Sequence, residues 1–323
     1  MSERIAVLLM HRGDPDSPAA AKEWLATAYG DPHAYRTSFG SGAQKFLGGF
    51  FSRFDAGEVK KRLEAIGGRS AAADQVTKLA GDLEQKLNGE TQGTGNAKYK
   101  VLPAMRWTAP SVQTAFETLK KDGITRVVGI SLYPQQCKRF SNTLLRATQT
   151  FGEGMDVSFI DRLTHQPKYF EALRATVSDA LGRSTDAFVL FAALGIEKAD
   201  AEEGDPYPQQ LVETVEQCMG AIDKPHRLGW LEDGGPGLTA SFMVGRAKDA
   251  GSSSLVLVPL GTVVDELNVL YHLDQTLKPL ARTKGFTSVE RTQAVATRPE
   301  LLDALQGALK EHLDRVAALG FQS

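Results

Sequence analysis

The chain has 323 residues, of which 42% are hydrophobic and 24% are charged, and its formal net charge is -2. That length predicts two domains, because single cores seldom grow beyond about 250–300 residues. The small net charge gives no basis for a nucleic-acid partner, and two cysteines cannot form a disulfide framework or an all-thiolate metal site. We therefore expect a globular protein of the reducing cytoplasm.

The first half begins with an apolar run, residues 5–10, which predicts a strand because it is too short for a signal peptide or a membrane span. A helix is predicted at residues 19–29, with Asp16 or Ser17 as its N-cap. Residues 38–54 mix glycines with large apolar side chains, and two interpretations stay open: a loop packed over the core, or a mobile lid over a ligand cleft or at a membrane surface. The remaining segments predict helices 55–66, 70–87, 111–121 and 141–151, and strands 99–105, 126–132 and 157–160.

The second half repeats this alternation, with predicted strands at residues 187–193, 227–230, 255–260 and 287–293 and a closing helix at residues 299–318. Strands that alternate with helices are typical of a parallel sheet. The sequence therefore predicts an α/β fold of two similar doubly wound, Rossmann-like domains, each with a four-stranded parallel sheet, at residues 1–162 and 163–323. A ligand cleft is expected between them.

Residues 255–274 indicate where that cleft lies, because an apolar run turns at Gly261 into a predicted helix. Asp265, Asn268, His272 and Thr276 follow at intervals of three or four, so they are expected to form one stripe facing a ligand. No dinucleotide fingerprint, phosphate loop or nucleophile motif is present in the sequence. The other histidines are expected at the surface or in caps: His33, His165, His226 and His312.

Seven segments, in order along nearly the whole chain, resemble the ferrochelatases, which insert ferrous iron into a porphyrin. They are LLMHRGDPDSP (8–18), EAIGGRSA (64–71), AMRWTAPSV (104–112), GISLYPQQCKRFSN (129–142), FIDRLTHQPKYFEAL (159–173), GDPYPQQ (204–210) and VPLGTVVDELNVLYHLD (258–274). The resemblance implies the chelatase fold, a place in tetrapyrrole metabolism, and a porphyrin or haem ligand.

The chain departs from the family pattern at the positions that carry the chemistry. Leu194 stands where the resemblance places a histidine that accepts pyrrole protons or contacts the metal, and Asn268 stands where it places the facing glutamate. His272 and Thr276 replace further carboxylates. Glu266 is a nearby carboxylate, but a two-residue helical offset predicts that it points about 200° away. No metal-binding residue is expected.

Basic residues are enriched at the expected cleft. Arg12, Arg69, Lys138 and Arg139 replace small or hydroxyl residues of the family pattern, and with His11 they predict an anion-binding cleft, although Arg69, Lys138 and Arg139 could equally point to solvent. The same strand-end loop supplies Tyr133 and Gln136 as candidate ligand contacts. His272 and Cys137 are further candidates, whereas Cys218 is expected in the core.

Three hypotheses follow. The first, which the substitutions favour, is a ferrochelatase-like protein that is impaired or inactive in iron insertion and binds a tetrapyrrole or another anion, as a carrier, regulator or partner of another haem-synthesis protein. The second is an active ferrochelatase in which His11, His272 or Glu266 accepts the protons. The third is a family member with different chemistry on a small anion. The apolar residues 46–54 also suggest a peripheral membrane contact.

Overall fold

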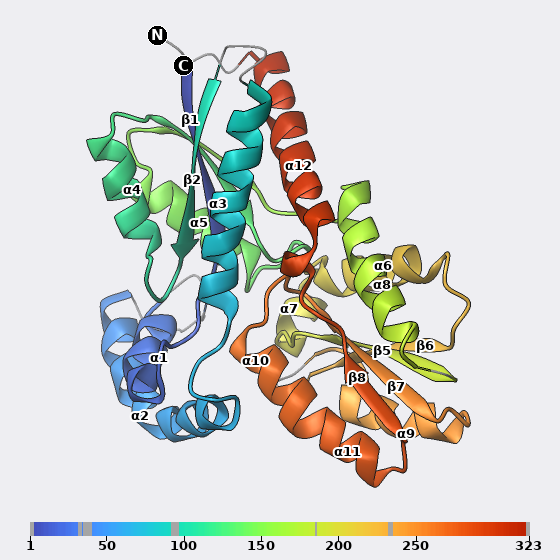
Figure 1. The fold of residues 1–323 in the computed structure, drawn as a ribbon. Coiled ribbons are helices and arrows are strands. Elements are labelled where there is room, and N and C mark those ends of the chain that lie inside the picture. Colours follow the sequence, from blue (N-terminus) through green and yellow to red (C-terminus); the bar gives the residue numbers. More distant parts are fainter. Residues whose placement is uncertain are drawn as a thin grey trace.

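The structure is a computed structural model that describes residues 3–31, 34, 41–91, 97–184, 186–231 and 235–320. Each half contains a four-stranded parallel sheet flanked by helices, and the two halves lie one above the other in Figure 1. The predicted α/β class with two similar four-stranded sheets is confirmed.

The helices and strands follow the predicted alternation. The first half comprises β1 (Glu3–His11), a 3₁₀ turn (Pro18–Ala20), α1 (Ala21–Tyr29), α2 (Ser41–Ala65), α3 (Ala72–Thr91), β2 (Ala97–Met105), α4 (Val112–Lys121), β3 (Arg126–Ser131), α5 (Ser141–Phe151) and β4 (Asp156–Ile160). The second half comprises α6 (Pro167–Leu181), β5 (Ala187–Ala193), α7 (Lys198–Glu202), α8 (Tyr207–Met219), β6 (His226–Trp230), α9 (Ala240–Asp249), β7 (Ser254–Leu260), α10 (Leu267–Leu270), a π-helical stretch (Tyr271–Leu277), α11 (Lys278–Thr283), β8 (Ser288–Arg291), a 3₁₀ turn (Val295–Thr297) and α12 (Pro299–Ala318).

Both sheets have the same strand order. The first is β2-β1-β3-β4 and the second is β6-β5-β7-β8, so in each half the second strand lies outside the first and the chain then crosses to the other side. The central strands β5 and β7 are buried at every position, as expected for apolar runs covered by helices on both faces. The order reverses between β1 and β3 and between β5 and β7, and ligands of doubly wound sheets bind at the carboxyl ends of strands at such points.

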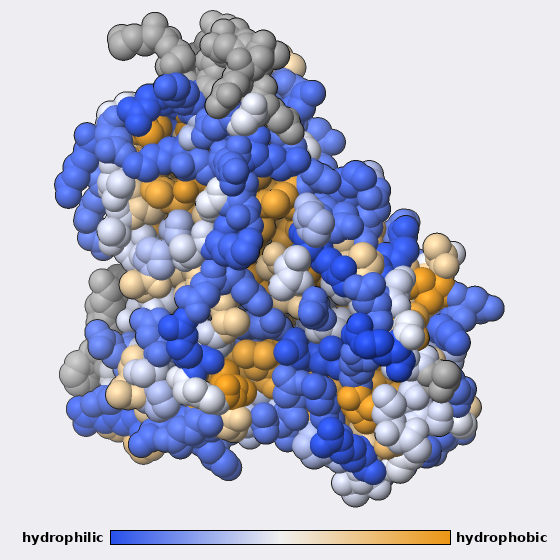
Figure 2. All heavy atoms as spheres, in the orientation of Figure 1, coloured by the Kyte–Doolittle hydropathy of each residue, from blue (hydrophilic) through white to orange (hydrophobic). Residues whose placement is uncertain are grey.

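The closing helix α12 ties the halves together. It packs on α6 and also reaches α3 and β4 of the first half, as Figure 1 shows. Lys86 of α3 pairs with Asp303 of α12 at 3.0 Å. On the face shown in Figure 2, hydrophilic residues cover most of the surface and hydrophobic residues lie in separate small patches.

Two expectations about local structure are wrong. The first is the loop at residues 38–54, because residues 41–54 belong to the 25-residue helix α2, which packs along α1; residues 38–40 and the side chains of Phe46 and Leu47 lie outside the described residues. The lid over a ligand cleft stays a prediction. Gly48 is a contact point between the two helices, because a Cβ there would lie 2.8 Å from the backbone nitrogen of Gly30. The helix after β7 begins at Leu267 and not at Val263, and it widens into π-helix from Tyr271.

Candidate functional site

A pocket lies where the sheet topology predicts it, at the carboxyl ends of β1, β3, β5 and β7, and α1 and α2 close one side. Its volume is about 280 Å³. The turns that lead into it depend on glycine: Gly13 and Gly261 have φ of 82° and 91°, and a Cβ at either would collide with the side chain of Thr108 or Tyr207. The lining residues are Arg12, Asp14, Trp24, Leu25, Tyr29, Asp55, Glu58, Val59, Arg62, Trp107, Arg139, Phe140, Leu194, Gly195, Leu231, Leu267 and Asn268.

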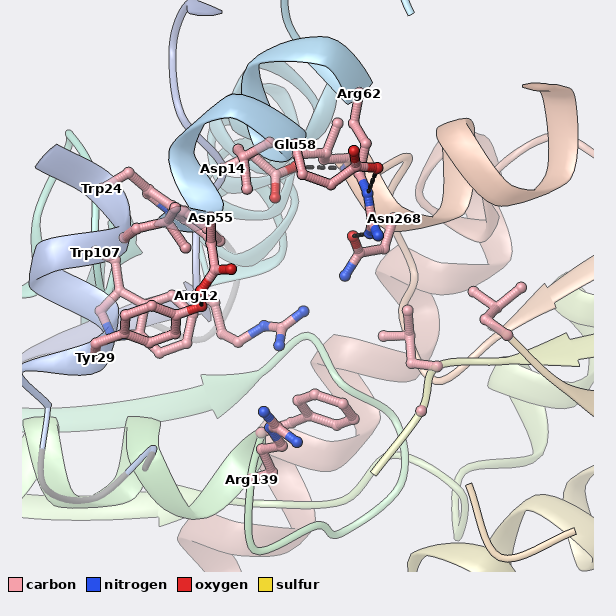
Figure 3. Close-up of a pocket in the computed structure, with 17 residues that line it drawn as sticks. Arg12, Asp14, Trp24, Tyr29, Asp55, Glu58, Arg62, Trp107, Arg139 and Asn268 are labelled. Carbon is pink, nitrogen blue, oxygen red and sulfur yellow. Dashed lines mark hydrogen bonds and ion pairs between the residues drawn. The ribbon is translucent and has the colours of Figure 1, made fainter. Parts of the chain in front are cut away.

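Arg12 lies at the centre of the pocket. Figure 3 shows its guanidinium group extending into the cavity between Asn268 and Arg139. Behind it, Nε donates to Tyr133 Oη at 2.9 Å and Nη2 lies 3.1 Å from Glu266 Oε1. The guanidinium carbon lies 4.6 Å from the ring centroid of Phe140 and 5.6 Å from that of Trp107. A guanidinium group has five N–H donors, and these contacts fix the position of Arg12 at the pocket lining.

Glu266 anchors this arrangement from the second half. Its side chain is 1% exposed, and Oε2 lies 3.0 Å from His11 Nε2 and 3.3 Å from Tyr133 Oη. His11 Nδ1 accepts a hydrogen bond from Gly13 N–H at 3.1 Å, so the ring proton lies on Nε2 and points at Glu266. Burial by itself raises the pKa of Glu266, but the charge of Arg12 and hydrogen bonds from His11 and Tyr133 outweigh it, and the pKa lies below its ordinary value.

Asp14 lies next to the hydrogen-bonded group of Arg12, His11, Tyr133 and Glu266, and it lines the pocket. Its Oδ2 accepts from Ser70 Oγ at 2.6 Å and from Leu267 N–H at 2.8 Å, which joins the two halves. Burial raises the pKa of Asp14, and the negative charge of Glu266 raises it further. Of these two carboxylates, Asp14 is therefore the one that takes up a proton first as the pH falls.

Helix α2 contributes the opposite wall. Arg62 Nη1 lies 3.5 Å from Asn268 Oδ1 and 3.4 Å from His272 Nε2, while Nε pairs with Glu58 at 3.2 Å. Asp55 accepts from Tyr29 Oη at 2.7 Å. Arg62 of α2 thus contacts both Asn268 and His272, which follow the turn after β7. Figure 3 shows Arg62 and Asn268 side by side at the pocket wall.

Comparison with known proteins identifies the family. The ferrochelatase family model matches residues 4–313. The chain belongs to the ferrochelatase family. Curated ferrochelatases of Geobacter metallireducens and Geotalea uraniireducens are 27% and 28% identical to it, covering 96% and 94% of this chain and 99% and 97% of their own length. The solved structure of SirB from Bacillus subtilis with Fe³⁺ covers 96% of this chain and 95% of its own, with a TM-score of 0.54 and 10% identity, and shows a common fold. Family membership supports a role in tetrapyrrole metabolism.

The two positions that the resemblance marks as substituted lie at the same pocket. Leu194 follows β5 and Asn268 is the second residue of α10, and both line the cavity. The predicted stripe with Asp265, His272 and Thr276 does not form. Asp265 precedes the helix and pairs with Arg291 at 2.6 Å, and the π-helical stretch alters the spacing beyond Tyr271, so that of the four residues Asn268 alone lines the pocket.

Glu266 requires a correction. Its backbone is extended, with φ of -84° and ψ of 165°, so it precedes α10 and the argument from helical rotation does not apply. Its carboxylate is buried behind Arg12. The side chains of Glu266, His11 and Tyr133 all support the pocket without lining it. His272 is likewise buried, 3% exposed, beneath Arg62.

The predicted basic cluster is only partly assembled. Arg139 lines the pocket and pairs with Glu197 at 3.3 Å. Lys138 points elsewhere and pairs with Glu203 at 3.4 Å, and Arg69 forms an exposed ion pair with Asp74, so neither converges on the cleft. Gln136 lines a different cavity.

The thiols and the remaining histidines lie away from the pocket. Cys137 and Cys218 are free and fully buried, and burial raises both thiol pKa values, that of Cys218 to about 12. His226 contacts the backbone carbonyl of Lys224, and His165 and His312 line the second cavity. His33 lies outside the described residues.

Sequence reasoning missed the residues that α1 and α2 bring to the pocket, namely Trp24, Tyr29, Asp55, Glu58 and Arg62, as well as Asp14 and Trp107. The spacing of Asp55, Glu58 and Arg62 at intervals of three and four was an available signal for one helical face. Within the part of the chain that the structure describes, no three His, Cys, Asp or Glu side chains are grouped so that they could hold a metal ion. None of the described helices combines the length and apolar character needed to cross a membrane.

Proposed function

We propose that this protein binds a tetrapyrrole through its carboxylate groups in the pocket between the two halves, and that it inserts ferrous iron poorly or not at all. The observation that carries the proposal is the contact of Arg62 with Asn268 and His272. The resemblance places carboxylates at these two positions. In this chain neither residue is a carboxylate, and the guanidinium group of Arg62 contacts both side chains, which favours an anionic ligand over a divalent metal ion.

The pocket suits the acidic edge of a macrocycle. Arg12, Arg62 and Arg139 offer guanidinium donors, which pair with carboxylates in a planar, two-point geometry. Trp24 and Trp107 provide aromatic surface beside them. A volume of about 280 Å³ lies just below the range of ligand pockets, roughly 300–1,000 Å³, so the pocket holds part of a tetrapyrrole or the whole of a smaller anion.

Iron insertion requires groups that accept the pyrrole protons. Leu194 has no lone pair, and the amide of Asn268 does not accept a proton at neutral pH. Loss of a positioned general base typically lowers a rate by about 10²–10⁴. Two such groups are replaced in one pocket, so turnover is expected near the rate of the uncatalysed reaction.

An anaerobic assay tests both parts of the proposal on the same samples. Ferrous iron and protoporphyrin are supplied to the wild-type protein and to a curated relative from the family, and porphyrin binding is measured in parallel. We expect binding without insertion. Insertion at a rate within about tenfold of the relative's would overturn the second part, and the absence of porphyrin binding would overturn the first in favour of a smaller anion.

A second candidate function rests on Asp14. The residues expected to accept protons in an active enzyme, His11, His272 and Glu266, do not line the pocket, whereas Asp14 does and its pKa is raised by burial. A carboxylate with a raised pKa is a better proton acceptor. If the assay detects insertion, Asp14→Asn should abolish it, and Asp55→Asn, at another pocket carboxylate, should reduce it less.

We also propose that α2 contacts a membrane surface. Phe50, Phe51 and Phe54 are 48%, 52% and 70% exposed and pack edge-to-face on one another, on the helix that lines the pocket with its other residues. Apolar side chains grouped on an exposed helix face are typical of interaction sites. The double substitution Phe51→Ser with Phe54→Ser should abolish co-sedimentation with liposomes, and co-sedimentation that persists in this variant would contradict the membrane contact.

We also propose a cytoplasmic location, which the free, buried cysteines support.

A further inference from the structure

A second cavity, of about 640 Å³, lies between the end of β4 and the last turns of α12, and it shares no lining residue with the pocket described above. Gln136 of the loop after β3 also reaches it. Its volume falls within the range of ligand sites, roughly 300–1,000 Å³. Apart from Gln136, none of its lining residues is among the candidate ligand contacts predicted from the sequence.

The cavity has an apolar side and a cationic side. Phe159 and Ile160 of β4 and Val316 of α12 supply apolar surface. Arg162, which follows β4, and Arg315, on α12, supply two guanidinium groups. Both lie near enough to His165 to lower its pKa, although burial is the larger cause and Glu311 opposes them.

Two carboxylates, Asp161 and Glu311, also lie on the lining. Glu311 accepts a hydrogen bond from Gln166 Nε2 at 2.8 Å and lies 3.7 Å from His165 Nε2. Neither arginine forms an ion pair with a carboxylate among the described residues. The two guanidinium groups, which come from different elements, thus face one cavity without a direct ion-pair partner.

His312 supplies an unsatisfied polar atom. Its Nε2 is buried and has no hydrogen-bond partner among the residues that the structure describes. Buried ring nitrogens are normally hydrogen-bonded, by protein, water or ligand. An acid group bound between Arg162 and Arg315 would accept a hydrogen bond from it.

We propose that this second cavity binds an amphiphilic organic anion, with its acid group on Arg162, Arg315 and His312 and its apolar body on Phe159 and Val316. The acid group is a carboxylate or a phosphate ester. This site is independent of the tetrapyrrole pocket, so either proposal can fail alone.

The test uses the full-length protein with nitrogen-labelled histidine and follows the ring signals by NMR. His165 and His312 report on the second cavity, and His272 reports on the first pocket. The probes are naphthoate, naphthyl phosphate and the neutral naphthylmethanol, which share one apolar body. The variants are Arg162→Gln and Arg315→Gln, with Arg146→Gln as the matched control, since Arg146 is exposed on α5 away from both cavities.

We expect at least one anion to shift the His165 and His312 signals saturably, at least tenfold more tightly than naphthylmethanol. Arg162→Gln and Arg315→Gln should each weaken that binding about tenfold, while Arg146→Gln should leave the affinity unchanged. In all three variants, any dissociation constant measured from the His272 signal, which reports on the first pocket, should equal that of the wild-type protein. The tighter anion identifies the acid group. Equal binding of the neutral probe, unchanged affinity in both arginine variants, or no saturable shift at these two histidines would overturn the proposal.

Discussion

The carboxyl ends of β1 and β5 are equivalent positions in two sheets of the same strand order, yet they differ in chemistry. After β1 the chain places Arg12 and Asp14 in the pocket, where Glu266 holds Arg12 and the N–H of Leu267 holds Asp14. After β5 it places Leu194 and Gly195 there, with nothing that ionises. The duplicated architecture thus keeps the geometry of a two-sided cleft, while the charged residues that line it come from the first half, through the β1 turn, the loop after β3 and α2.

This difference shows how the second half still controls the site. From the second half, Glu266 fixes Arg12 from behind and Glu197 pairs with Arg139, although neither carboxylate lines the cavity. The second half therefore positions a functional group that belongs to the first. Changes on the two sides should have different consequences, and the predictions below separate them.

Glu266→Gln should produce the largest loss of stability. Removing one member of a buried ion pair costs about 3–5 kcal/mol. Because the folded pKa of Glu266 is below its ordinary value of about 4.3, its contribution is complete above that pH and disappears as the pH falls through the lower folded pKa. Urea unfolding of both proteins across this pH range measures it. Glu64→Gln, at an exposed pair with Lys60, is the control and should cost less than about 1 kcal/mol. A difference that does not shrink in acid would contradict the assigned role.

Arg12→Gln should weaken porphyrin binding by about tenfold to a hundredfold, because a charge-assisted hydrogen bond contributes about 1.5–3 kcal/mol and each 1.4 kcal/mol is a factor of ten. Fluorescence titration measures the affinity. The substitution leaves Glu266 without this partner, so the double variant Arg12→Gln with Glu266→Gln separates lost binding from lost stability. Unchanged affinity in a folded double variant would show that the first half does not supply the ligand contact.

Gly48→Ala should destabilise the protein by about 1–3 kcal/mol, since the new methyl group would press α2 away from the backbone at the end of α1. Gly49→Ala is the matched control: a Cβ at that position would have nothing within 4 Å, and a helical Gly→Ala change gains up to about 1 kcal/mol. Thermal unfolding of the pair tests whether α2 packs tightly on α1 at Gly48. Equal stabilisation by both substitutions would contradict that close contact.

Arg69→Gln and Lys138→Gln should have the smallest effects, changing porphyrin affinity less than twofold. Both side chains form ion pairs outside the pocket, with Asp74 and Glu203. Arg139→Gln, the neighbour that does line the cavity, is the positive comparison and should weaken binding measurably. A loss on substituting Lys138 as large as that for Arg139 would mean that the loop after β3 rearranges around its ligand.

The sequence was sufficient for the framework of the fold and insufficient for the interior of the site. Helix 141–151, strand 187–193 and helix 299–318 were predicted with the bounds that the structure has, because apolar periodicity is a local property. The second part of α2 was predicted as the helix 55–66, but its first part, residues 41–54, was missed. Glycine and serine lower helix propensity there, while the stability of the helix comes from packing on α1.

Side-chain direction after a strand depends on partners far along the chain. Arg12 turns into the pocket because Glu266 holds it, 254 residues away, and Lys138 turns out because Glu203 does. No pattern around either residue carries that information. The substitutions Leu194 and Asn268 were visible from the resemblance, but the arginine that lies on Asn268 comes from α2 and appears only in the folded protein.

The central claim is that the pocket selects an anionic group through arginines of the first half. It is tested most directly by comparing protoporphyrin with its dimethyl ester, which keeps the macrocycle and removes both negative charges. Quenching of the tryptophan fluorescence of Trp24 and Trp107 reports binding in the pocket itself. We predict that the free acid binds at least tenfold more tightly than the ester, and that Arg12→Gln removes most of this difference. Equal or tighter binding of the ester would contradict the account.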